Sequence, residues 1–397
     1  MSAPFIHKIL IVLIFGGIAT GCTEQYVLQT NTFEQAIVVE ATLTNEVKNQ
    51  EIKVSRTFRF EENGPTFETG AEVFVTDDSG NRFDFAENDG KYVSTVAFAA
   101  ETGKAYRLNI TTAQGTTYQS TAEALTTING MEHVTAGVKV KNGKRGVAIT
   151  AHSFDAGNSS KYYRYQYEET YKIVTPKWDA FRATVVAGTP HDTIVLVPRD
   201  ATEIRTCYGT DASNDIIQTT TIGLSEDRVD FDLRFINDQN PIIAHRYSIL
   251  VHQYVQSVEA YTFYKTMKDL SGSGSILSQN QPGFFSGNIS NADNPAEKVI
   301  GFFEVASVSS QRIFFNYTDL FPGEQLETYF VDCTSRRLKF CFDANDFECR
   351  GNVLLSAIRS EDLLYFDNNG LYYDMVLPPC GDCTTFSSNA VPPFWTN

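Results

Sequence analysis

Several features are scarce or missing in this chain of 397 residues, and each excludes a class of protein. The six histidines form no H-E-x-x-H or His-x-His pattern, so a zinc hydrolase is not indicated. There is no G-x-S-x-G elbow and no P-loop. Lysine and arginine total 32 against 48 aspartates and glutamates, a net charge of −16. A body this acidic does not bind nucleic acid or an anionic lipid surface by electrostatics.

Long apolar runs are also missing, and the one short run lies at the start of the chain. His7 and Lys8 precede the apolar stretch 9–15, small residues follow, and Cys22 comes next. The stretch is too short for a stable membrane-spanning helix and has the layout of a secretory signal. With Ala19 in a position where a branched aliphatic residue is commoner, the run before Cys22 resembles a bacterial lipobox. The alternative is an ordinary signal whose cysteine is accidental.

We therefore expect residues 1–21 to be removed, Cys22 to carry lipid, and residues 22–34 to form a tether. The first 21 residues contain one lysine and no acid, so the mature chain would carry 31 − 48 = −17. The protein would then be held at a membrane by its lipid anchor.

Cysteine is sparse, and most of it lies near the C-terminus. Besides Cys22, the disulfide candidates are Cys207, Cys333, Cys341, Cys349, Cys380 and Cys383. An even number in an exported chain favours up to three disulfides, and six cysteines allow 15 pairings. A redox pair at Cys380 and Cys383 is the less favoured alternative. No histidine lies near these cysteines, so no metal site is expected.

The abundant residues predict a mainly β protein. Phenylalanine (29) and tyrosine (19) are frequent, and aromatic residues favour strands. Residues 35–127 contain about seven short strands separated by turns every 8–12 residues, a pattern typical of an immunoglobulin- or transthyretin-like β-sandwich. The predicted strands are 36–41, 51–58, 71–76, 82–85, 91–93, 105–110 and 116–120.

Residues 128–397 are predicted to form a second β-rich region with one or two short helices. One possible division is a second sandwich over 128–250 and a disulfide-stapled part over 251–397. We expect a hairpin over 137–150, strands over 161–169, 247–255, 299–305 and 312–315, and a helix over 257–270 capped by Ser257. Lys265 and Lys268 would lie in the last turn of this helix.

Three tyrosines offer the clearest possible ligand contact. Tyr163, Tyr165 and Tyr167 fall on one face of a strand by its two-residue period. They could form a stacking platform for sugars or other flat ligands. Alternatively, they are the inner face of a sandwich or a module interface, where tyrosine is common.

Other polar groups give weaker signals, and no cofactor is expected. Glu168 and Glu169 point in opposite directions along a strand, so they cannot flank one glycosidic bond. A hydrolase of unfamiliar type would have to use Glu168, Glu169 or His191. The acidic runs at 77–78 and 87–89 lack the regular ligand spacing of a calcium loop and favour turns.

Many short segments, in order, are similar to one bacterial lipoprotein family. They are residues 22–26, 37–41, 54–57, 70–73, 162–165, 168–170, 246–251, 259–261, 287–291, 299–303, 380–383 and 393–395. The chain resembles the family catalogued as domain of unknown function 4249, found mainly in Bacteroidota. Tyr165 and Tyr208 stand where the family usually has tryptophan, and both are aromatic exchanges.

The resemblance implies an outer-membrane lipoprotein, often encoded beside TonB-dependent receptors. Together with the missing catalytic motifs, it predicts a non-catalytic accessory protein that captures a small molecule or glycan at such a β-barrel. The alternative is a structural or adhesive surface protein, or a subunit of an outer-membrane assembly complex. The expected location is the outer membrane, with the body facing the cell surface; Glu24 alone follows Cys22 as an acidic surface signal.

Overall fold

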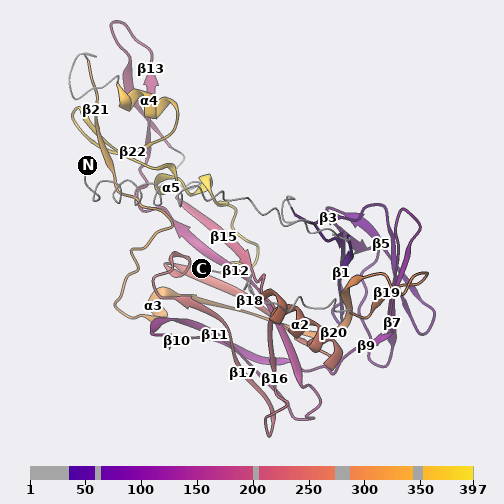
Figure 1. Cartoon of the computed structure of the whole chain (residues 1–397). Coiled ribbons are helices and arrows are strands. Elements are labelled where there is room, and N and C mark those ends of the chain that lie inside the picture. The colour runs from indigo at the N-terminus through magenta and orange to yellow at the C-terminus, as the bar shows by residue number, and fades with distance from the viewer. Residues whose placement is uncertain (1–34, 59–63, 200–204, 273–286, 343–351, 397) are drawn as a thin grey trace, which may run out of the picture.

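The computed structural model describes residues 35–58, 64–199, 205–272, 287–342 and 352–396 (Figure 1). The predicted signal, Cys22, most of the tether and Cys349 lie outside these ranges. The prediction of a mainly β protein with few short helices is confirmed, since strands make up 50% and helices 11%. None of the helices in the described ranges combines the length and apolar character needed to cross a membrane.

The N-terminal module is a strongly curled sheet with the strand order β20-β1-β2-β6-β5-β4-β7-β8-β19. Its strands are β1 (Ile37–Thr44), β2 (Glu51–Arg56), β3 (Thr66–Phe67), β4 (Glu72–Asp77), β5 (Arg82–Asn88), β6 (Lys91–Ser94), β7 (Ala105–Thr111), β8 (Thr117–Ser120), β9 (Glu123–Ala124), β19 (Ile289–Asn291) and the first half of β20 (Val299–Asn316). Alternate side chains point inward, and Val39, Val75 and Leu108 are among the core residues. All seven strands predicted before residue 127 are present.

Residues far along the chain complete this module. Val299–Ala306 of β20 pair in parallel with β1, and β19 pairs with β8. The sequence assigned both segments to the second region. A parallel neighbour cannot arrive through a tight hairpin, so it has to come from a distant part of the chain.

The second module is a sandwich of two sheets. One sheet has the order β15-β12-β18-β20, with β16 beside β12, and the other has the order β10-β11-β17. The bounds are β10 (Met131–Lys141), β11 (Lys144–Asp155), β12 (Tyr162–Val174), β15 (Thr206–Ala212), β16 (Ile217–Thr220), β17 (Asp227–Asn237), η1 (Pro241–Ile243) and β18 (Arg246–Val255). The predicted hairpin is confirmed, and its turn uses positive φ at Asn142 (52°) and Gly143 (75°).

Strand β20 runs through both modules. The sequence predicted two strands separated near residue 308, but residues 299–316 form one strand of 18 residues. Its second half, from Ser307, pairs with β18. The polar residues that interrupt the apolar pattern are hydrogen-bonded: the Ser307 hydroxyl donates to Thr127 O at 2.7 Å, and Ser309 Oγ accepts from Met131 N at 3.0 Å.

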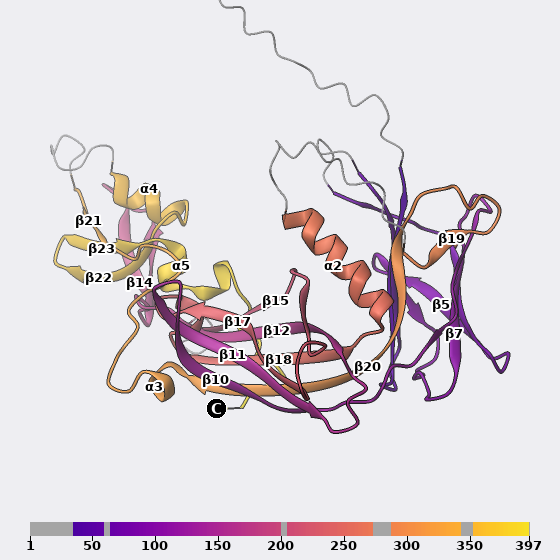
Figure 2. The same cartoon turned by 60° about the horizontal axis from the view of Figure 1, so that its bottom comes forward.

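A distal module lies at the opposite end of the second module from the N-terminal module (Figures 1 and 2). It consists of β13 (Phe181–Val186), β14 (Thr193–Pro198), β21 (Arg336–Lys339), α4 (Val353–Arg359), β22 (Leu364–Asn369) and β23 (Tyr372–Val376). The hairpin β13–β14 leaves the second module between β12 and β15, and its inward residues Val185 and Leu196 pack on the core around Leu354 and Met375. This hairpin was not predicted from the sequence.

The C-terminal segment is fastened to the second module. It includes α5 (Pro378–Gly381) and η3 (Cys383–Thr385), and the short helix α3 (Tyr317–Leu320) precedes it. Disulfides join Cys207 to Cys383 and Cys333 to Cys380. Cys380 and Cys383 therefore do not pair with each other, and the alternative of a redox pair is wrong. Cys341 is also disulfide-bonded.

Aromatic side chains also fasten the tail to the second module. The ring of Trp395 lies 4.9 Å from that of Tyr208, and Arg312 lies 3.6 Å from the ring of Phe394. These contacts hold the end of the chain against β15 and β20.

Candidate ligand-binding cleft at the module junction

Helix α2 (Val258–Gly272) lies where the N-terminal and second modules meet (Figure 2). It begins as predicted, because Ser257 Oγ accepts from Ala260 N at 3.1 Å. It ends two residues later than predicted, so Lys265 and Lys268 are not in the last turn and that detail is wrong. Its buried residues Ala260 and Phe263 pack on Phe302 of β20.

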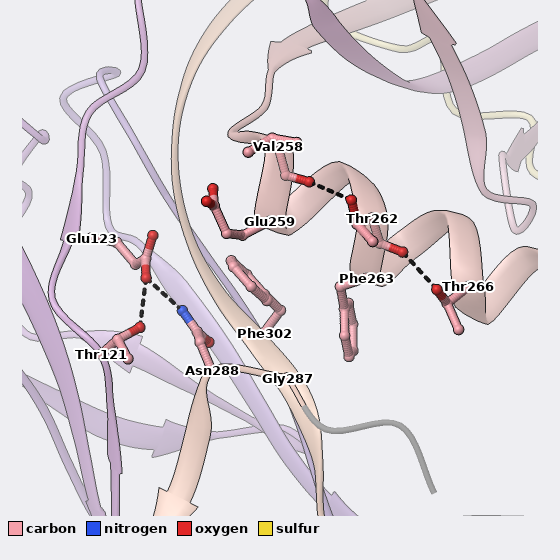
Figure 3. A pocket seen from close by; sticks show the side chains of 10 residues that line it. All are labelled: Thr121, Glu123, Val258, Glu259, Thr262, Phe263, Thr266, Gly287, Asn288 and Phe302. Atoms are coloured by element: carbon pink, nitrogen blue, oxygen red, sulfur yellow. Dashed lines mark hydrogen bonds between the residues drawn. The ribbon is translucent and has the colours of Figure 1, made fainter. Parts of the chain in front are cut away.

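Between α2, β9 and the β19–β20 region lies a cleft of about 570 Å³, called here the junction cleft (Figure 3). It is lined by Thr121, Glu123, Val258, Glu259, Thr262, Phe263, Thr266, Gly287, Asn288 and Phe302. The rings of Phe263 and Phe302, with centroids 5.6 Å apart, form its apolar floor. In Figure 3 the side chains of Glu123 and Glu259 enter the space from opposite walls.

Hydrogen bonds fix the polar walls of the junction cleft. Glu123 Oε1 accepts from Thr121 Oγ1 at 2.6 Å and from Asn288 Nδ2 at 2.9 Å. Thr262 and Thr266 donate their hydroxyls to the carbonyls of the residues four positions earlier, at 2.7 and 2.8 Å. These side chains are therefore positioned before any ligand arrives.

Two backbones meet beside this cleft without room for a side chain. An added Cβ on Gly287 would lie 1.5 Å from the carbonyl oxygen of Gly301. The neighbouring Asn288 fastens the crossing, because its amide donates to Phe303 O at 2.9 Å and accepts from Phe303 N at 2.7 Å. The sequence offered a signal in the isolated glycines of both segments, but periodicity cannot show that they touch.

A buried ion pair joins the two modules at Glu304, two residues after Phe302 in β20. Arg164 of β12 donates to Glu304 of β20 at 2.8 Å, and the two side chains are 7% and 2% exposed. Gln256 Nε2 donates to the second carboxylate oxygen of Glu304 at 2.8 Å. Arg164 also lies 4.3 Å from the ring of Tyr254. Burial lowers the pKa of Arg164, but the Glu304 carboxylate and the nearby Tyr264 and Tyr254 together outweigh burial, and the net pKa is raised.

The three predicted stacking tyrosines are part of the second module's interior. Tyr163 and Tyr165 are 0% exposed, and Tyr167 packs on the same core while partly exposed. The hydroxyl of Tyr163 donates to Asp227 at 2.9 Å, and that of Tyr165 donates to Gln253 at 2.9 Å. A ring with no exposed surface cannot stack on a ligand, so the alternative of an inner sandwich face is the correct one for Tyr163 and Tyr165.

The structure does not bring the suggested hydrolytic residues together. Glu168 is exposed, whereas Glu169 is 2% exposed on the opposite face. Glu169 accepts from Arg234 at 3.0 Å and from the Tyr247 hydroxyl at 2.5 Å. His191 lies between β13 and β14 in the distal module, with its ring 5.0 Å from Phe342.

The acidic run at residues 77–78 stabilises a turn. Asp77 accepts from Ser79 N and Asn81 N at 3.0 and 2.8 Å. Burial acts to raise its pKa, but these hydrogen bonds with Asn81 and the nearby Lys104 lower it overall. Within the described ranges, no group of three or more His, Cys, Asp or Glu side chains could hold a metal ion.

The fold and the junction cleft together define a modular, β-rich protein with a preformed recess between modules. The family model described as Domain of unknown function (DUF4249) matches residues 23–312, and the chain belongs to this family. The match includes every residue of the junction cleft and ends within β20, so the predicted similarity of residues 380–383 and 393–395 lies beyond it. A search of curated proteins finds no match to the chain.

Proposed function

We propose that this protein is a lipid-anchored accessory protein of the outer membrane, which captures a ligand beside a TonB-dependent transporter and catalyses no reaction. The observation that carries the proposal is the junction cleft, an apolar floor with fixed polar walls at the boundary of two modules. Recesses at module boundaries with a few oriented polar groups are the usual form of small-molecule sites.

The chemistry of the cleft fits a neutral ligand with one apolar face. The rings of Phe263 and Phe302 would contact that face, while Glu123 and Glu259 accept hydrogen bonds from its hydroxyl groups. A sugar ring has both features, so a glycan or a related small molecule is the class of ligand we propose.

The structural role of Glu169, one of the suggested catalytic groups, supports the non-catalytic part of the proposal. Glu169 is held by Arg234 and Tyr247 in the core. These hydrogen bonds stabilise the second module, and burial leaves the carboxylate no access to a substrate.

The experiment is affinity purification of the tagged, full-length protein from its native membranes in mild detergent, followed by mass spectrometry. We expect a TonB-dependent β-barrel in stoichiometric amount. Cys22→Ala is the matched control, because the unlipidated chain should lose the barrel. A lone lipoprotein would contradict the proposal, and a stoichiometric complex of different composition would favour the structural or assembly role.

A further inference from the structure

A second recess, of about 620 Å³, lies in the distal module and is unrelated to the junction cleft. It is lined by residues of the hairpin β13–β14, of α4 and of β22. One part of its wall is apolar, with Ile358, Leu363, Leu364 and Met375. The other part carries Arg182 and Arg199 from the hairpin.

The guanidinium group of Arg199 has only part of its hydrogen-bond donors satisfied. Its Nη1 donates to Gly381 O at 3.1 Å, but its buried Nε has no hydrogen-bond partner among the described residues. Among the described residues, no carboxylate lies within ion-pair distance of Arg199. Arg234, by contrast, donates hydrogen bonds to both carboxylate oxygens of Glu169. A buried N–H without an acceptor costs free energy, so Arg199 Nε is a donor that a ligand oxygen could satisfy.

Arg182 adds a second positive charge to the wall that carries Arg199. Arg182 is exposed, and its side chain makes no hydrogen bond or ion pair with the described part of the chain. Arg199 N donates to Ala180 O at 2.7 Å, which continues the β13–β14 ladder. Residues 180 and 182 lie on one face by the two-residue period, so Arg182 and Arg199 are diagonal neighbours. Burial, and then the charge of Arg182, lowers the pKa of Arg199, while Asp382 and Asp179 act against this.

The acids that line the recess form no ion pair with these two arginines. Arg359 is paired with Asp192. Asp382 lines the recess, but its Oδ1 already accepts from the backbone and hydroxyl of Thr384, at 2.9 and 2.7 Å. Glu361 is the other acid of the lining. Arg182 and Arg199 therefore share the recess with two carboxylates to which, among the described residues, neither arginine is bonded.

We propose that this recess binds the carboxylate of a small organic acid that carries an apolar group. The planar fork of an arginine matches the two oxygens of a carboxylate, and Arg199 Nε is the donor that such an oxygen would satisfy. The apolar wall of Ile358, Leu363 and Met375 would cover the rest of the ligand. The proposal does not depend on the membrane partner or on the junction cleft.

The test uses the full-length protein in mild detergent and isothermal titration calorimetry with N-acetylphenylalanine as the probe. We expect saturable binding that weakens with added salt, and binding of the matching amide, N-acetylphenylalaninamide, weaker by about tenfold or more. Inorganic phosphate is titrated in the same way as a second probe. Equal affinity for acid and amide, no saturable binding, or phosphate binding as tightly as the acid would each overturn the proposal.

Variants then locate the site. Arg182→Gln touches no described contact, so the fold is kept, and it should weaken binding of the acid several-fold. Arg199→Gln should weaken it by about tenfold or more. Arg199→Gln also loses the bond to Gly381 O, which Arg182→Gln keeps, so weaker binding in both variants assigns the effect to the two guanidinium groups. Arg228→Gln, an exposed residue of the second module, is the matched control and should bind as the wild type does. Unchanged affinity in Arg182→Gln and Arg199→Gln would place the acid elsewhere.

Discussion

At the scale of single residues, buried charges join segments that the sequence keeps far apart. Arg164 and Glu304 are 140 positions apart, and Glu169 and Arg234 are 65 apart. Glu169 was visible in the sequence as a candidate acid, but its partner was not. Spacing reveals which face a side chain occupies, whereas a partner on another strand depends on the sheet topology.

Removing one member of the Arg164–Glu304 pair should be strongly destabilising. In Glu304→Ala the buried guanidinium loses its counterion, and we expect the free energy of unfolding in urea to fall by about 3 kcal/mol or more. The double variant Arg164→Met, Glu304→Leu should recover most of this loss, because no uncompensated charge remains. The exposed pair of Glu226 with Arg228 is the control, and Glu226→Ala should change stability by less than about 1 kcal/mol. Equal losses for Glu304→Ala and Glu226→Ala would refute the prediction.

A second prediction concerns Asp155, which holds the turn between β11 and β12. Burial acts to raise the pKa of its carboxyl group, but the backbone amides of Ser160, Ser159 and Gly157 donate to it and lower the pKa overall. Because the folded pKa lies below the unfolded value of about 3.9, the stabilisation is complete above that pH and is lost as the pH falls below it. Asp155→Asn should therefore be less stable than the wild type at neutral pH, and the difference should shrink in acid. Urea titrations at several pH values measure it; a difference independent of pH would contradict the account.

At the scale of elements, the local patterns of the sequence were sufficient for most strands but not for their partners. The seven N-terminal strands and the capped start of α2 follow from alternation, turn residues and Ser257. The hairpin β13–β14 was missed, although Ile194 and Leu196 alternate with exposed residues as a half-buried strand does. Strand β20 was divided in two because Ser307, Ser309 and Ser310 interrupt its apolar pattern.

The crossing of Gly287 and Gly301 gives a prediction at this scale. Gly287→Ala would force two backbones apart, since both atoms in conflict belong to the main chain or to Cβ. We expect a loss of about 2 kcal/mol or more in unfolding free energy, a lower melting temperature and a distorted junction cleft. Gly130→Ala is the matched control, because an added Cβ there meets nothing within 4 Å. A melting temperature for Gly287→Ala equal to that of Gly130→Ala would show that the crossing is looser than the structure has it.

At the scale of the whole molecule, three modules are joined by strands, ion pairs and disulfides. Strand β20 belongs to two modules, and the Cys207–Cys383 bridge links positions 176 residues apart. The junction cleft and the distal recess lie at different ends of this assembly, so each can be tested without altering the other.

The proposed anchor is tested on the whole protein. Cys22→Ala should move the chain from the membrane pellet to the supernatant after a high-salt wash, while the wild type stays in the pellet. Lipid attachment is the reason, because a body of this acidity is repelled by anionic lipid. Retention of Cys22→Ala in the washed pellet would contradict the lipid anchor.

The sequence by itself determined the β-rich class, most strand positions, the start of α2 and the family, because alternation, capping and turn chemistry act over a few residues. Only the tertiary structure decided that β20 completes the N-terminal module, that Tyr163 and Tyr165 are core residues, and that Cys380 and Cys383 have separate partners. It also placed Phe263 beside Phe302 and Arg182 beside Arg199. These outcomes depend on contacts between distant segments, and the free energy of such contacts is set by packing and desolvation in the folded chain, which no local pattern records.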